Sequence, residues 1–185
     1  MLHAPAGAVR GAAILCHPHP QYGGDMDNPV VVAVTDALVG AGIAALRFNF
    51  GGVGASQGTY DAGGQEQCDV GAAEAALAGR MPTGTPLAVV GYSFGSWVGA
   101  RAAAGLPRVR RVVAIGPPLA FMEWSFVHSL RQPLDVVVGD RDQYCPRDAL
   151  ERLGARTTIL AGADHFFGRV EAAVGRAVVE LLADL

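Results

Sequence analysis

The sequence predicts an α/β protein built on a mostly parallel, doubly wound sheet with helices on both faces. Short apolar runs without polar alternation recur along the chain, as expected for strands that are covered on both sides. Segments with apolar residues at helical spacing separate these runs. With 185 residues, 51% of them hydrophobic, and no repeat or linker, we expect a single domain spanning residues 1–185.

The strands are predicted from runs that are short, apolar and bounded by turn residues, and they number about six or more. In chain order they are Ala12–Cys16, Ile43–Phe50, Leu87–Val90, Arg111–Ile115, Pro133–Gly139 and Thr157–Ala161. Right-handed crossovers between successive strands bring their carboxyl ends to one edge of the sheet, where such folds place their functional residues.

The helices are predicted from apolar stripes with start and stop signals at their ends. Asn28 and Pro29 form an N-cap and first-turn pair, whereas Gly79 and Pro82 end the second helix. The predicted helices are residues 29–40, Glu66–Arg80, the segment from Ser93 to Gly105, Pro146–Leu153 and Arg169–Leu185.

Composition excludes several function classes. The net charge is −3, all 14 basic residues are arginine, and no basic run alternates with aromatic residues, so we expect no nucleic-acid partner. No apolar run reaches the length of a membrane span and no signal peptide is present, which predicts a cytoplasmic protein without a membrane partner. Cys16, Cys68 and Cys145 lack CxxC spacing, so we expect reduced thiols.

The segment Pro86–Gly105 has the layout of a nucleophile elbow. An apolar strand leads into Gly91-Tyr92-Ser93-Phe94-Gly95, and small and apolar residues then continue at helical spacing. Such a turn needs glycine two residues before and after the serine, and it exposes the hydroxyl at the sheet edge in front of a helix N-terminus. The pattern predicts that Ser93 is a nucleophile.

A second match to the same pentapeptide surrounds Ser56. Three residues separate this match from the preceding strand, and no helix is predicted directly after it. We therefore expect Ser56 to be a loop serine that satisfies backbone groups.

A serine nucleophile needs a base, and the base needs an acid that orients it. His165 follows the last predicted strand, and Asp140 and Asp142 both follow the strand that ends at Gly139. We favour Asp142, because the turn must carry the acid beyond the strand end, and interpret Asp140 as a turn residue. Asp164 is a weaker candidate, since it is adjacent to His165 in the sequence and poorly placed to orient its ring.

The loop His17–Gly24 is expected to complete an oxyanion hole, which needs two backbone N–H donors. One donor would be Phe94; the other would be His19, with Gln21 and Tyr22 as alternatives, because Pro18 and Pro20 cannot donate. His17 and His19 could share a metal ion, but no third ligand has a suitable spacing, so we predict neither a metal nor another cofactor.

Several of these segments closely resemble small proteins of the α/β-hydrolase superfamily related to dienelactone hydrolases. The resemblance covers residues 12–170 and includes LCHPHPQYGGDMDNPVV, LRFNFGGVGASQGTYDAGGQEQCD, GYSFGSWV and AGADHFFGR. It implies the α/β-hydrolase fold, a Ser93–Asp142–His165 triad and acyl-ester chemistry. In that superfamily the acid commonly lies three residues after the strand-ending glycine, as Asp142 follows Gly139.

Only 16 residues, Pro117–Gln132, separate the fourth and fifth predicted strands, too few for a large cap domain. We expect an open site for small to medium acyl esters, lined by side chains that include His17, Tyr22, Phe121, Met122 and Trp124; the bulky residues among 117–132 could instead fill core beneath the loop. A thioester, lactone or dienelactone substrate, or a non-catalytic binding scaffold, are the alternatives. The sequence leaves the oligomeric state open.

Overall fold

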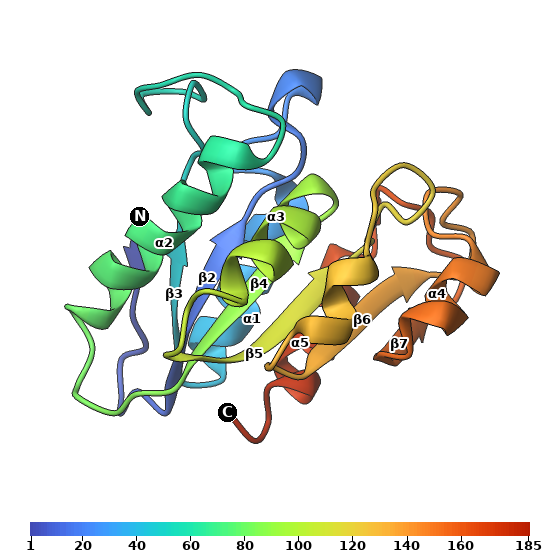
Figure 1. Cartoon of the computed structure of the whole chain (residues 1–185). Helices are drawn as coiled ribbons and strands as arrows, with labels where there is room; N and C mark the ends of the chain where they lie inside the picture. Colours follow the sequence, from blue (N-terminus) through green and yellow to red (C-terminus); the bar gives the residue numbers. More distant parts are fainter.

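The computed structural model describes all 185 residues and contains one seven-stranded sheet (Figure 1). The strand order is β1-β3-β2-β4-β5-β6-β7, and every neighbouring pair is parallel except β1 with β3. The sheet is therefore the mostly parallel one that the sequence predicts. Its strands are β1 (Leu2–His3), β2 (Gly11–Cys16), β3 (Ile43–Arg47), β4 (Leu87–Tyr92), β5 (Val109–Ile115), β6 (Leu134–Gly139) and β7 (Arg156–Leu160).

Helices cover both faces of the sheet. In Figure 1, α2 (Gly64–Ala78) and α3 (Phe94–Ala103) lie in front of the sheet, and α1 (Pro29–Gly40) and α5 (Glu171–Leu181) lie behind it. Successive strand residues point to opposite faces, so each face has its own apolar core: Ile14 packs with α2 and α3, and Leu15 with α1 and α5. The short helices are η1 (Pro20–Tyr22), η2 (Ser125–Ser129) and α4 (Arg147–Leu153).

Several boundaries differ from the prediction by a few residues, and three of these differences have a clear local reason. The strand expected over Ile43–Phe50 ends at Arg47, because its neighbour β2 ends at Cys16 and the last paired residues are Leu15 and Arg47. Helix α2 begins before Glu66, whose carboxylate accepts the backbone N–H of Gly63 and so caps the first turn. Helix α5 begins after Arg169, because the positive φ of 69° at that residue is not helical.

The two-residue strand β1 and the helices η1 and η2 were not predicted, because elements this short have no periodicity. Between β5 and β6 the chain forms only η2, and no cap domain covers the sheet edge. No helix combines the length and the apolar character that a membrane crossing requires.

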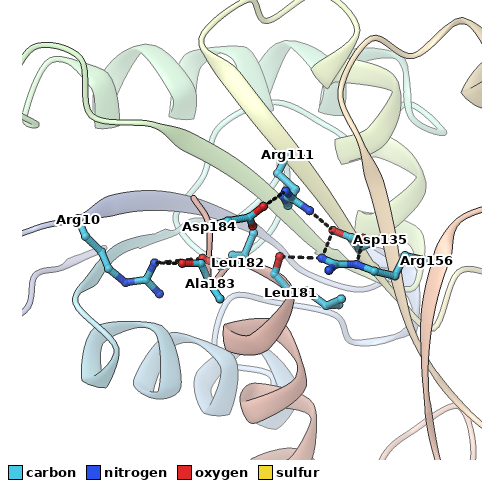
Figure 2. Close-up of polar contacts among 8 residues, drawn as sticks. All are labelled: Arg10, Arg111, Asp135, Arg156, Leu181, Leu182, Ala183 and Asp184. Atoms are coloured by element: carbon cyan, nitrogen blue, oxygen red, sulfur yellow. Dashed lines mark hydrogen bonds and ion pairs between the residues drawn. The ribbon is translucent and has the colours of Figure 1, made fainter.

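A charged network joins the amino-terminal edge of the sheet to the end of α5 (Figure 2). Asp135 of β6 is 2% exposed and accepts hydrogen bonds from Arg111 (3.0 Å) and Arg156 (2.7 and 3.2 Å). Arg156 also donates to the carbonyl of Leu181 at 3.0 Å, and Arg111 pairs with Asp184 at 2.7 Å. Positive charge at a helix C-terminus is favourable, so this network fixes α5 against the sheet.

Candidate active site

Ser93 lies in a strained turn between β4 and α3. Its backbone angles are φ 52° and ψ −121°, in the positive-φ region that non-glycine residues rarely occupy. A Cβ atom at Gly91 would lie 2.2 Å from the carbonyl oxygen of Gly95, and one at Gly95 would lie 2.3 Å from that of Cys16. The turn therefore closes only because both positions are glycine.

The Ser93 hydroxyl begins a continuous chain of hydrogen bonds. Its Oγ lies 2.9 Å from Nε2 of His165, and Nδ1 of His165 lies 2.9 Å from Oδ2 and 3.1 Å from Oδ1 of Asp142. His165 is 3% exposed and Asp142 7% exposed, whereas Ser93 is partly open to solvent. The arrangement pairs a buried acid and base with an accessible hydroxyl.

Of the three candidate acids, the structure brings only Asp142 to His165. Asp140 instead accepts the backbone N–H of Gly162 at 2.7 Å, and Asp164 accepts that of Phe166 at 2.9 Å, so both stabilise turns. Oδ1 of Asp142 also accepts the N–H of Tyr144 at 2.9 Å, which fixes the orientation of the carboxylate.

The backbone of His165 is held in place by the side chain of Tyr92. The Tyr92 hydroxyl donates to the carbonyl oxygen of His165 at 3.0 Å. Burial raises the pKa of Tyr92, so this hydroxyl keeps its proton and remains a donor across the neutral range. The last residue of β4 therefore positions the histidine that contacts Ser93.

Two backbone N–H groups of the predicted oxyanion hole have no partner within the chain. Phe94 is the first residue of α3, where a helical N–H has no intrahelical acceptor, and the N–H of His19 donates to no protein atom. The alternative donors are occupied: the N–H of Gln21 donates to Nδ1 of His19, and that of Tyr22 to the carbonyl of His19. The free groups are thus those of Phe94 and His19.

His17 does not line the site, and the prediction that it contacts substrate is wrong. Its side chain is fully buried, with Nδ1 2.7 Å from the carbonyl oxygen of Pro18 and Nε2 accepting the N–H of Phe50 at 3.1 Å. Burial lowers the pKa of His17, in keeping with a neutral ring that has one donor and one acceptor nitrogen. His17 therefore ties the end of β2 to the segment after β3.

The ring of His19 joins two loops above the sheet edge. Because Nδ1 accepts the N–H of Gln21, the proton of the neutral ring is on Nε2, which lies 3.0 Å from the hydroxyl of Tyr60. Burial lowers the pKa of His19, which favours this neutral form. No group of three or more side chains suited to bind a metal ion is present in the structure.

The apolar side chains expected to line the site divide into two groups. Tyr22 and Phe121 are 88% and 72% exposed at the carboxyl edge of the sheet. Trp124 is only 7% exposed and belongs to the core, so its prediction as a substrate contact is wrong. Met122 and Trp124 line a cavity of about 250 Å³ between η2 and α4, to which no member of the triad contributes.

Tyr60, Tyr144 and Phe166 were not predicted as site residues. The ring of Tyr144 lies 4.5 Å and that of Phe166 5.6 Å from the ring of His165, measured between centroids. A signal existed for both, because Tyr144 follows Asp142 by two residues and Phe166 follows His165 directly. Tyr60 follows a glycine-rich loop, and the sequence contains no signal that places it beside His19.

Comparison with known proteins relates this geometry to a family. The model of the family described as "Alpha/beta hydrolase domain" matches residues 11–181. An uncharacterized protein of Rickettsia prowazekii is 35% identical over 169 residues, which cover 84% of this chain and 71% of that protein.

Solved structures agree with this relationship. An α/β serine hydrolase homologue from Coxiella burnetii has a TM-score of 0.88 and 30% identity, with 98% of this chain and 90% of that chain covered. An α/β serine hydrolase without a lid from Xanthomonas campestris also has a TM-score of 0.88 and 30% identity, with 98% and 86% covered. The strained elbow, the parallel sheet and these matches together show that the chain belongs to the α/β-hydrolase family.

Proposed function

We propose that this protein is a serine esterase that hydrolyses small to medium acyl esters through an acyl-enzyme. The observation that carries the proposal is the unbroken hydrogen-bonded chain from the Ser93 hydroxyl through His165 to Asp142. A serine hydroxyl is a weak nucleophile at neutral pH, and this chain supplies both the base that it needs and the acid that orients the base.

In the first step, Oγ of Ser93 bonds to the ester carbonyl carbon while Nε2 of His165 takes the hydroxyl proton. Asp142 stabilises the resulting imidazolium without taking its proton. The same proton then passes to the alcohol oxygen as the carbon–oxygen bond breaks, so the alcohol leaves and an acyl-Ser93 ester remains. Water, activated by His165, attacks this ester, releases the acid and restores the Ser93 hydroxyl.

Both steps place negative charge on the carbonyl oxygen. The free N–H groups of Phe94 and His19 are the donors that we assign to this oxyanion, and the N-terminus of α3 adds a favourable field. Tyr60 supports the arrangement by its contact with the ring of His19. A preorganised donor of this kind contributes about 10²–10³-fold to turnover in serine hydrolases.

The open edge of the sheet supports a substrate of modest size. Only η2 interrupts the segment between β5 and β6, and no further domain encloses the acyl chain. The similar Xanthomonas campestris protein is likewise an α/β serine hydrolase without a lid. All three cysteines are free thiols, which supports our further proposal of a reducing, cytoplasmic setting.

A fluorophosphonate probe and a panel of p-nitrophenyl esters test this proposal. We expect the probe to label Ser93, and Ser93→Ala to abolish labelling and lower kcat/KM by at least about 10⁴-fold. Ser56→Ala is the matched control, because Ser56 lies in the second copy of the motif and its hydroxyl donates to the carbonyl of Asn49.

Retention of activity in Ser93→Ala would contradict the assignment. Failure to turn over or react with the probe would instead favour a binding scaffold. Thioesters and lactones in the same panel establish which acyl bond is preferred, since one triad can cleave all of these.

A further inference from the structure

Three aromatic side chains form a cluster beside His165, defined by Phe121, Tyr144 and Phe166. Phe121 is 72% and Phe166 61% exposed, which is unusual for phenylalanine and leaves both rings accessible at the sheet edge. Ring centroids lie 5.1 Å apart for Phe121 and Tyr144 and 6.4 Å apart for Tyr144 and Phe166. Both pairs have the edge-to-face geometry that aromatic rings favour.

The cluster is built from three separate segments, two of which are joined by a backbone hydrogen bond. Phe121 belongs to the loop after β5, which is joined to the turn after β6 by a hydrogen bond from the N–H of Ala120 to the carbonyl of Tyr144, 3.0 Å long. Phe166 belongs to the turn after β7, whose conformation the Asp164 carboxylate fixes by accepting the N–H of Phe166. The backbone positions that carry the rings are therefore fixed before any ligand binds.

The position of the cluster relative to the proposed reaction identifies its occupant. His165 must give its Nε2 proton to the oxygen of the leaving alcohol, so this oxygen lies within hydrogen-bond reach of Nε2 when the ester bond breaks. The carbonyl oxygen points instead to the N–H groups of Phe94 and His19. Two rings of the cluster, those of Tyr144 and Phe166, lie against the ring of His165, so the group attached to the leaving oxygen has aromatic side chains beside it.

We propose that Phe121, Tyr144 and Phe166 form a leaving-group subsite that binds an aromatic alcohol portion of the ester. The proposal rests on the esterase activity proposed above and adds a substrate class to it: esters whose aromatic ring lies on the alcohol side. Flat rings offer edge and face contacts to all three side chains, whereas a short alkyl alcohol contacts them little. The subsite makes no demand on the acyl side.

Two isomeric esters test this inference directly. Benzyl acetate has its ring on the alcohol side and methyl phenylacetate has it on the acyl side, while both leaving groups are primary alcohols of similar acidity. We expect kcat/KM for benzyl acetate to exceed that for methyl phenylacetate by about tenfold, as one aromatic contact can supply. In Phe121→Ala and Phe166→Ala this ratio falls by about threefold to tenfold.

Ile159→Ala is the control, because Ile159 is also an exposed apolar residue, at 49%, but lies on the edge strand β7. We expect this substitution to leave the ratio unchanged. A ratio at or below one, or a ratio that neither phenylalanine substitution lowers, overturns the subsite while hydrolysis of both esters upholds the esterase. If neither ester is hydrolysed and the fluorophosphonate probe labels nothing, both proposals fail together.

The competing explanation is that the cluster is a contact surface for a second copy of the chain. In that case the phenylalanine substitutions change the sedimentation coefficient and leave the ratio of the two kcat/KM values unaltered, which overturns the subsite. A lowered ratio with an unchanged sedimentation coefficient supports it.

Discussion

Two buried aspartates lie at opposite ends of β6 and have opposite kinds of partner. Asp135, at the start of the strand, is held by Arg111 and Arg156, which carry permanent charges (Figure 2). Asp142, three residues beyond the end of the strand, faces His165, whose other ring nitrogen lies 2.9 Å from the Ser93 hydroxyl. The two carboxylates are chemically the same. Their partners therefore decide whether a buried aspartate stabilises the fold or takes part in the proposed reaction.

The largest effect is expected when the carboxylate of Asp142 is removed. Asp142→Asn keeps the shape of the side chain but no longer holds His165 in the required tautomer, so we expect kcat/KM to fall by about 10³–10⁴-fold. The free energy of unfolding should change little, by less than about 1 kcal/mol, because the amide oxygen can still accept the N–H of Tyr144. Ester kinetics and urea unfolding measure the two quantities, and an active Asp142→Asn variant would exclude Asp142 as the triad acid.

The opposite result is expected at the other end of the strand. Asp135→Asn leaves Arg111 and Arg156 without their carboxylate, and we expect the free energy of unfolding to fall by about 2–3 kcal/mol, less than for a fully buried pair because both arginines reach solvent. For folded protein, kcat/KM should stay within about twofold of the original. Asp148→Asn, which removes an exposed pair with Arg152, is the control and should change neither quantity measurably.

His17 tests the same comparison from the other side. It lies at the carboxyl edge of the sheet, as Asp142 does, but both of its ring nitrogens have fixed hydrogen-bond partners, as the carboxylate of Asp135 does. Burial lowers its pKa in the folded state, so below about pH 6.5 the unfolded chain binds more protons than the folded one and stability falls as the pH falls. This one group contributes a slope of up to about 1.4 kcal/mol per pH unit. In His17→Gln the slope between pH 6.5 and 5 should be smaller by up to that amount; equal slopes for the two proteins would mean that folding does not lower the pKa of His17.

The smallest effect is expected at Arg10, which joins the amino-terminal edge to two helix ends. Its guanidinium donates to the carbonyls of Ala41, after α1, and of Leu182, after α5. We expect Arg10→Met to lower the free energy of unfolding by about 0.5–1 kcal/mol and to leave kcat/KM unchanged. Thermal unfolding at low and high salt separates the electrostatic part, which salt should reduce.

The sequence carries enough information for the sheet and the triad because both depend on local patterns. Apolar runs predict β2 to β7 within a few residues, and the resemblance to the α/β hydrolases, in which the acid lies three residues after the strand-ending glycine, favours Asp142 over Asp140, as the structure then shows. Burial of single side chains depends on contacts between distant segments. For this reason the sequence indicates neither that His17 meets Phe50 nor that Trp124 enters the core, and it does not reveal that Phe121 and Phe166 meet at Tyr144.

The strained backbone of Ser93 also bears on the evolutionary selection that has acted on this position. A residue held at φ 52° and ψ −121° destabilises the fold by about 1–3 kcal/mol, a sizeable share of the 5–15 kcal/mol by which domains are stable. Glycine relieves most of this strain, so Ser93→Gly would yield a more robust scaffold from a single codon change. A lineage that used the chain only to bind a ligand would gain from that substitution and lose nothing. The presence of serine at the turn therefore favours a history in which its hydroxyl has been in use.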